Sequence, residues 1–289
     1  MRCVIDVDLP AYATQVLPWL LRDPVVNNVA CSLIEQRLDG AVPTEADALW
    51  LRVLDTGDGT AGIALQTPPW GLLMSGMPDP AAEAVAESLA ERHPALATVN
   101  GPNEASGMFA ARYAELTGTV AGRGMAQRMY RLDTVTAPNG VPGRLRAVTD
   151  GERDLLVEWS TGFLSDAMPH AVHSAAATVD SRLAQGGLLW FWEVGGRPVS
   201  MAWLNHPAAG VARISGVYTP PELRGRGYAS GSVATLSQYV LDHGGKACML
   251  YTDLANPTSN AIYQRLGYRP VADVQEWRFT SQPAVGEAR

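Results

Sequence analysis

A glycine-rich stretch in the second half of the chain is the first feature with chemical meaning. The stretch consists of Arg224, Gly225, Arg226, Gly227, Tyr228, Ala229 and Ser230. It lies between an apolar segment typical of a strand and a segment whose apolar residues recur at helical spacing. Glycine lets a backbone approach a ligand without a Cβ clash, and N–H groups at the start of a helix carry partial positive charge. The stretch therefore predicts a binding site for a diphosphate, to which both arginines add charge.

Two other phosphate-binding loops fit this stretch poorly. A Walker A loop ends in Gly-Lys-Ser/Thr, whereas the single lysine of the chain is Lys246. A dinucleotide fingerprint needs a third glycine where this sequence has Ser230, and no acidic strand end follows about 20 residues later. A second Gly-Arg-Gly, at residues 122–124, falls between an expected helix and an expected strand, so we expect a turn there.

Two segments of the second half resemble the signature segments of the GNAT superfamily of N-acetyltransferases. The first runs from Val217 to Ala229 and contains the glycine-rich stretch, and the second runs from Asn256 to Tyr268. The resemblance covers residues 143–280 in the order and spacing of the expected elements. The first half resembles a degenerate copy of the same fold.

The resemblance implies a role for each matching residue. Acyl-coenzyme A is expected between two splayed parallel strands, here residues 211–219 and 247–253. Backbone groups of Val217 and Thr219, with Tyr218 between them, are expected to hold the thioester carbonyl and the pantetheine arm. Residues 224–230 would surround the pyrophosphate, and Asn256 and Asn260 would hydrogen-bond the coenzyme from the far side. Tyr263 corresponds to the general acid that protonates the departing thiolate.

The general base has no clear candidate in the sequence. An amine acceptor is protonated at neutral pH and must lose a proton before it attacks the thioester carbonyl. The expected strand at residues 211–219 contains no carboxylate, which leaves Glu193, His206 and Asp253 near other expected strand ends. His170 and His173 lack the partners of a metal motif, so we expect no metal.

The positions of the expected elements predict two domains of one fold class. The segment Thr134–Gly143 contains two prolines and two glycines and is the expected linker between residues 1–136 and 143–289. We expect an α/β (α+β) protein of two GNAT-like domains, each a mixed central sheet flanked by helices. In the second half we expect strands at 145–148, 188–194, 198–204, 211–219, 247–253, 268–271 and 275–279, and helices at 150–168, 171–185, 227–243 and 257–266. In the first half we expect strands at 49–54, 61–65, 72–75 and 96–99, and helices at 81–92 and around 113–116.

The first half departs from the second where the coenzyme would bind. The tetrad Tyr113–Leu116 matches Tyr263–Leu266 at a separation of 150 residues. The position of the glycine-rich stretch is taken by Met77–Pro80, in which two prolines lack N–H donors and an aspartate repels phosphate. We therefore expect no coenzyme site in the first domain and a structural role for Tyr113.

Composition limits the class of protein. The chain has 289 residues, 47% of them hydrophobic, and a formal net charge of -7. All of that negative balance lies in residues 1–140, so an anionic ligand is better placed in the second half. An acidic chain does not suit nucleic acid or an anionic membrane. The three cysteines are far apart and fit neither a zinc site nor a disulfide framework. Two early aspartates and the absence of a long apolar run predict a cytoplasmic protein.

The sequence therefore favours an enzyme that moves an acetyl or short acyl group from coenzyme A to a small-molecule or peptide amine. One alternative is a coenzyme-binding sensor or regulatory module without turnover. Another is a nucleotide-binding domain whose loop only resembles the GNAT loop. The acceptor, the acyl chain length and the oligomeric state are left open by the sequence.

Overall fold

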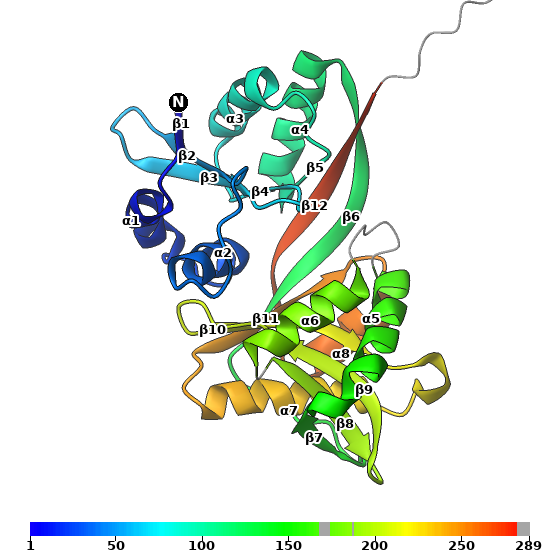
Figure 1. The fold of residues 1–289 in the computed structure, drawn as a ribbon. Coiled ribbons are helices and arrows are strands. Elements are labelled where there is room, and N and C mark those ends of the chain that lie inside the picture. Colours follow the sequence, from blue (N-terminus) through cyan, green and yellow to red (C-terminus); the bar gives the residue numbers. More distant parts are fainter. Residues whose placement is uncertain (168–173, 187, 282–289) are drawn as a thin grey trace, which may run out of the picture. The chain divides into compact units, whose positions relative to one another are not determined.

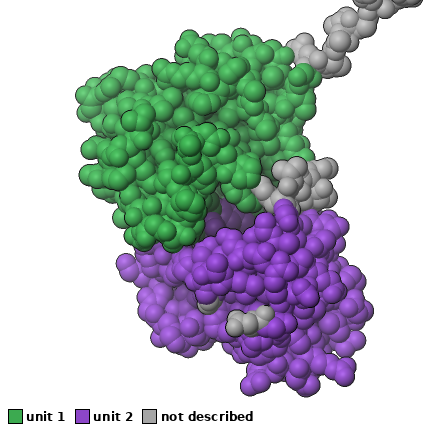
Figure 2. Space-filling view, viewed as in Figure 1, with its two compact units in different colours: residues 1–128, 272–289 green, residues 129–271 purple. Residues whose placement is uncertain are grey.

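The computed structural model describes residues 1–167, 174–186 and 188–281 of the chain (Figure 1). Two compact units make up the chain (Figure 2). The first unit consists of Met1–Arg128 together with Ala272–Arg289, and the second consists of Met129–Val271.

The first unit is built on a sheet of order β1-β2-β3-β4-β5-β12-β6. Its strands are β1 (Arg2–Asp6), β2 (Leu49–Leu54), β3 (Thr60–Gln66), β4 (Leu72–Met74) and β5 (Thr98–Pro102), with parts of β6 (Thr119–Leu132) and β12 (Arg269–Ser281). Its helices are α1 (Leu9–Leu20), α2 (Asn28–Leu38), α3 (Asp79–Arg92) and α4 (Asn103–Thr117). On α3, Ala82, Val85, Ala86 and Leu89 recur at helical spacing and are buried in one core.

The second unit is built on a sheet of order β6-β11-β10-β9-β8-β7. Its own strands are β7 (Arg144–Ala147), β8 (Leu189–Val194), β9 (Arg197–Leu204), β10 (Val211–Tyr218) and β11 (Ala247–Asp253). Its helices are α5 (Arg153–Ala167), α6 (Ala175–Gln185), α7 (Tyr228–Asp242) and α8 (Pro257–Arg265), with short 3-10 turns at Asp150–Glu152 and Pro221–Leu223.

Helices pack on both faces of the second sheet because its strands are apolar on both sides. On β10, Ala212 and Ile214 belong to the core that also contains Val233 and Leu236 of α7. Residues of a strand alternate between the two faces, so Arg213 lies on the opposite face. The cluster that contains Leu156 and Trp159 of α5 also contains Met201 and Trp203 of β9. The face opposite α7 is thus the one on which α5 packs.

The two units repeat one topology, which confirms the predicted fold class. In the first unit β1 to β4 pair antiparallel in sequence order and β4 pairs parallel with β5. In the second unit β7 to β10 pair antiparallel in the same order and β10 pairs parallel with β11. In both units the parallel pair therefore follows three antiparallel pairs.

The boundaries between the units differ from the segment that the sequence marks as a linker. Residues 134–143 lie inside the second unit, and Thr136 N–H donates to the Leu266 carbonyl there. The chain enters the second unit within β6 and returns to the first within β12. The returning part of β12 pairs antiparallel with β5, from Val274 opposite Pro102 to Arg278 opposite Thr98. Proline and glycine mark irregular backbone, but they do not show which strands pair.

The local structure differs from the sequence-based expectations at three places. Residues 122–124 lie inside β6 and form no turn. A Cβ on Gly124 would come within 2.8 Å of the Glu276 carboxylate, so this glycine allows a close approach in the sheet. The pieces 268–271 and 275–279 form one continuous strand, β12. The first strand, β1, was not expected, because its pattern is short and interrupted by charge.

Candidate active site

The parallel strands β10 and β11 pair over only part of their length. Val211, Ala212 and Arg213 pair with Ala247, Cys248 and Met249. Both strands continue for several residues, yet among the described residues no further pair joins them. The ladder therefore opens toward the carboxyl ends of the strands, where the resemblance places the thioester.

A β-bulge reshapes β10 beyond the last parallel pair. Ser215 lies opposite Trp203 and Tyr218 lies opposite Met201, so Gly216 and Val217 together face Ala202. Gly216 has φ +55, and a Cβ there would come within 2.6 Å of Trp203 Cε2. Only glycine suits this position, because it accepts the left-handed backbone and leaves room for the indole.

The bulge also fixes the end of the strand. Ser200 Oγ donates to the Tyr218 carbonyl at 2.9 Å, and Thr219 Oγ1 donates to Ser200 Oγ at 2.9 Å. Arg224 Nε donates to the Thr219 carbonyl at 2.9 Å. Both carbonyl oxygens thus have partners within the protein, and the strand end is held rigidly to β9 and to the glycine-rich stretch.

The glycine-rich stretch presents a set of unpaired backbone donors. Helix α7 begins at Tyr228 after Gly227, whose φ is +79, and no side chain caps its N-terminus. Gly225 has φ +77, and a Cβ there would meet no atom within 4 Å. Among the described residues, the backbone N–H groups of residues 225–230 donate to no acceptor. Unpaired N–H groups at the start of a helix are typical of an anion site, so the diphosphate site expected from the sequence stays a prediction.

The two arginines of this stretch differ in their surroundings. Arg224 forms an ion pair with Asp166 at the end of α5, and its guanidinium lies 5.7 Å from the centre of the Tyr218 ring. Within the described residues, Arg226 donates only to the Glu222 carbonyl, at 3.5 Å, and its side chain is exposed. Arg226 is therefore the more available partner for a phosphate, whereas Arg224 holds the loop to β10 and α5.

The two asparagines of the second signature segment hold the chain after β11. Asn256 caps α8, because its Oδ1 accepts from Ser259 N–H at 3.0 Å. Asn260 Nδ2 donates to the carbonyls of Asp253 and Asn256, and its Oδ1 accepts from the Tyr130 hydroxyl at 2.9 Å. These side chains position α8 against the end of β11, so their direct contact with a coenzyme stays a prediction.

Tyr263 differs in its hydroxyl from the two tyrosines that pack beside it. The residue is 8% exposed and packs beside Tyr130 and Tyr268, with ring centres 6.5 and 5.9 Å away. The Tyr130 hydroxyl binds Asn260, and the Tyr268 hydroxyl binds Ser237. The Tyr263 hydroxyl has no hydrogen-bond partner among the described residues. Burial raises the pKa of Tyr263 to about 12, which keeps this hydroxyl protonated at neutral pH.

Tyr113, the counterpart of Tyr263 in the first unit, has a hydroxyl whose hydrogen bonds are all made within the core. The Tyr113 hydroxyl donates to the His93 carbonyl and accepts from Leu96 N–H at 3.1 Å. Its ring is stacked on Phe109, with centres 5.4 Å apart. Tyr113 is fully buried, and burial raises the pKa of its hydroxyl. Both hydrogen-bonding directions of this hydroxyl are used in the core, as expected of a structural residue.

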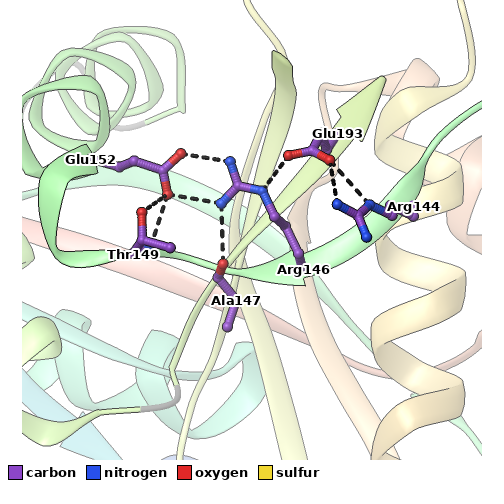
Figure 3. Close-up of polar contacts among 6 residues, drawn as sticks. All are labelled: Arg144, Arg146, Ala147, Thr149, Glu152 and Glu193. Atoms are coloured by element: carbon purple, nitrogen blue, oxygen red, sulfur yellow. Dashed lines mark hydrogen bonds and ion pairs between the residues drawn. The ribbon is translucent and has the colours of Figure 1, made fainter. Parts of the chain in front are cut away.

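Glu193 is committed to a network of arginines (Figure 3). Its carboxylate accepts from Arg144 at 2.9 Å and from Arg146 at 2.6 Å, and Arg146 also binds Glu152. The guanidinium groups of Arg146 and Arg144 lower the pKa of Glu193. A carboxylate held in this way is a weak base, so the structure gives Glu193 a role in joining β7, β8 and the 3-10 turn at Asp150–Glu152.

The other two candidates for the general base lie at chain turns. Asp253 Oδ1 accepts from Ala255 N–H at 2.8 Å, which makes it a turn-forming residue at the end of β11. His206 is half-buried in the loop after β9. His170 and His173 lie outside the described residues, and no group of metal-ligating side chains occurs within them. No helix in the described part of the chain is long and apolar enough to cross a membrane.

Comparison with known proteins agrees with this geometry. Residues 153–268 match the family described as "Acetyltransferase (GNAT) family". A mycothiol acetyltransferase of Pseudarthrobacter chlorophenolicus is 34% identical over 89 residues, which are 28% of this chain and 27% of that protein. The match thus spans only about a quarter of that relative's length.

Solved structures resemble the whole chain in fold. A Drosophila protein superposes with a TM-score of 0.69 at 13% identity, over 98% of this chain and 100% of its own. A tandem GNAT protein from the clavulanic acid biosynthesis pathway superposes with a TM-score of 0.54 at 14% identity, over 98% and 99%. Residues 153–268 are therefore similar to the GNAT family of acetyltransferases, and the whole chain shares the fold of a tandem GNAT protein.

Proposed function

We propose that the second unit transfers an acetyl or short acyl group from coenzyme A to a primary amine, without a metal and by direct attack. The observation that carries this proposal is the set of unpaired N–H groups at residues 225–230, joined through Arg224 to the strand end where β10 and β11 part. The pyrophosphate would accept from these N–H groups, and the thioester would lie in the opening of the ladder beside Val217.

The chemistry of the transfer assigns one step to Tyr263. The uncharged amine nitrogen attacks the thioester carbonyl carbon and releases one proton to solvent, and the carbon–sulfur bond breaks as the amide forms. Negative charge develops on the sulfur, and the Tyr263 hydroxyl donates a hydrogen bond and then its proton to that atom. Since burial holds the pKa of this hydroxyl at about 12, the proton is present throughout the physiological range. Solvent then restores the proton to the phenolate.

A Tyr263→Phe variant tests this assignment. General acid catalysis contributes about 10²–10⁴-fold, so we expect thiol release to fall by that factor. Acetyl-coenzyme A should bind as tightly as to the wild type in calorimetric titration, since the phosphate loop is unchanged. Tyr113→Phe is the matched control, because the Tyr113 hydroxyl makes its hydrogen bonds inside the core of the first unit. Unchanged turnover in Tyr263→Phe would remove the assigned role.

A coenzyme-binding module without turnover is the second candidate. One observation favours it: of the three carboxylate or imidazole candidates for the base, Glu193 is held by two arginines and Asp253 by a turn. Such a module would bind acetyl-coenzyme A near one molecule per chain and release no thiol with any amine of a broad panel. Binding of ATP or NAD in preference to the coenzyme would contradict both candidates.

A further inference from the structure

Two arginines of the second unit lie together without a carboxylate partner. Arg182 of α6 and Arg213 of β10 both donate to one oxygen, Asn205 Oδ1, at 3.1 and 3.3 Å. Among the described side chains neither forms an ion pair. Other arginines of this unit behave differently, since Arg144, Arg146, Arg153 and Arg224 each pair with a carboxylate. The other described arginines of this unit that form no ion pair, Arg197, Arg226, Arg265 and Arg269, are exposed, whereas Arg182 and Arg213 are half-buried.

The side chains around this pair hold that one acceptor in place. Asn205 is 6% exposed, and its Nδ2 donates to the Arg213 carbonyl and to Ser215 Oγ, both at 2.9 Å. These two bonds fix the amide so that its oxygen faces the guanidinium groups. A guanidinium carries five N–H donors, so one shared oxygen leaves most donors of these two half-buried arginines without a protein acceptor among the described residues, open to solvent or a ligand.

A buried indole adds another donor without an acceptor. Arg182 lies over the Trp203 ring, with its Cζ 4.6 Å from the ring centre. Trp203 is 5% exposed, and its Nε1 has no hydrogen-bond partner in the described part of the chain. Buried donors without acceptors are rare in folded proteins and call for an explanation. The cluster therefore has a surplus of donors and positive charge that a ligand rich in acceptors would satisfy.

The electrostatics of the pair point the same way. Burial lowers the pKa of Arg182 to about 10, and the nearby charge of Arg213 lowers it further. Burial also lowers the pKa of Arg213. Lowered arginine pKa values mean that the charged forms are held at a free-energy cost in the unliganded protein. An anion between the two guanidinium groups would remove both the repulsion and the missing hydrogen bonds.

The position of the cluster distinguishes it from the predicted pyrophosphate site. Arg213 is the last residue of β10 that pairs with β11, so it lies where the ladder opens. Its side chain is on the face away from α7, whereas residues 225–230 lead into α7. Val217 follows four residues later on the same strand, which corresponds to about 13 Å of extended backbone. The cluster is thus within the length of a small molecule from the expected thioester.

We propose that Arg182 and Arg213 bind a carboxylate or phosphate group of the acceptor, so that the acceptor is a small amine that also carries an anion. This inference rests on the proposed acyl transfer and names the class of its acceptor. The amine of such a molecule would reach the thioester near Val217 while its anion is held at the guanidinium pair.

Matched acceptors test the proposal. With saturating acetyl-coenzyme A, thiol release is compared for 6-aminohexanoate against pentylamine, and 8-aminooctanoate against heptylamine, which differ by the carboxylate and hold it well away from the amine. 6-Aminohexyl phosphate against 6-aminohexanol tests phosphate in the same way. We expect kcat/KM to favour one anionic series at least tenfold. In Arg182→Met this preference should fall about 10–100-fold, while the neutral amines change less than twofold.

Two further measurements do not depend on turnover. Inorganic phosphate, added to the coenzyme A complex so that the loop is occupied, should raise the Tm of the wild type but not of Arg182→Met. The unliganded Arg182→Met protein should melt at the wild-type temperature or above, since one of two repelling charges is gone. Arg153→Met, which breaks a surface ion pair between α5 and α6, is the control and should keep the anion preference.

The outcomes separate this inference from the proposed function. Turnover with equal preference for neutral and anionic amines would overturn the anion site and keep the acyltransferase. Weaker coenzyme binding by Arg182→Met would assign the arginines to the coenzyme and overturn the inference. A lower Tm in Arg182→Met with unchanged preference and unchanged phosphate response would give the pair a structural role. Failure of the wild type to bind acetyl-coenzyme A would instead remove the proposed function itself.

Discussion

Replacing Gly216 by alanine tests how much the bulge of β10 contributes to stability and to the site. Gly216 combines a left-handed backbone, φ +55, with a direct contact to the Trp203 indole. The new methyl group would come within 2.6 Å of Trp203 Cε2, closer than carbon atoms approach one another. Either the indole moves or the bulge opens, and both changes act on the strand end that leads to Val217.

The magnitude follows from two contributions. A left-handed backbone costs an L-residue roughly 1–2 kcal/mol. Overfilling a packed core costs typically about 1–3 kcal/mol, since side chains leave their preferred rotamers. The sum is about 2–5 kcal/mol, and at ~3 °C per kcal/mol for a domain of this size the Tm falls by about 6–15 °C.

Gly195→Ala is the matched control for the backbone contribution. Gly195 has φ +57, but a Cβ there meets no atom within 4 Å, so only the first contribution applies. Differential scanning calorimetry of both variants therefore measures the overlap with Trp203 as a difference. We expect Gly216→Ala also to lose thiol release while Gly195→Ala keeps it. Equal Tm losses in the two variants would refute the reasoning, because they would show that the Trp203 indole moves aside at no cost in free energy.

Two further predictions concern stability. Glu152→Gln should lower the free energy of unfolding at pH 7 by up to about 3 kcal/mol, because the Arg146 guanidinium holds the pKa of Glu152 at about 2 instead of its ordinary 4.5. That stabilisation is complete above pH 4.5 and is lost as the pH falls toward 2. The free energies of unfolding of wild type and variant, measured by urea melts, should therefore converge near pH 2. A difference that stays constant with pH would contradict this prediction. Phe279→Ala removes a ring whose centre lies 4.7 Å from that of Tyr113 and 6.3 Å from that of Phe109. The free energy of unfolding should fall by about 2–3 kcal/mol. Amide exchange should then speed up in α4 and not in α7; an equal rise in α7 would count against a local effect.

The elements of the second unit follow closely from local sequence pattern. The apolar residues of α7 recur on one face, and the strand predicted at residues 247–253 is β11 with the same bounds. Gly225 and Gly227 have the positive φ values that glycine favours, which is why the loop was identifiable. Periodicity and glycine position are local properties, and they are readable without knowing which segments meet.

Long-range pairing was not readable in this way. Nothing in residues 269–281 shows that they complete the sheet of the first unit, because strand pairing depends on which edge is open. The arginine cluster was missed for the same reason. Arg182, Asn205 and Arg213 come from three elements, and each looks like an ordinary surface or loop residue in the sequence. A signal was present only in the neutral charge balance of the second half, which favoured an anionic ligand there.

The return of β12 to the first unit has a consequence for biosynthesis. Ribosomes deliver the N-terminus first, and domains usually fold in that order. Here β5 must wait for the strand that begins to pair at Val274, which is a delay of roughly 10–30 s at ordinary elongation rates. During this time one edge of the nascent first sheet is exposed to pairing with other chains. The half that is synthesised first is thus the half that finishes folding last. A chaperone that covers the exposed edge of this half on the ribosome would matter most during that delay.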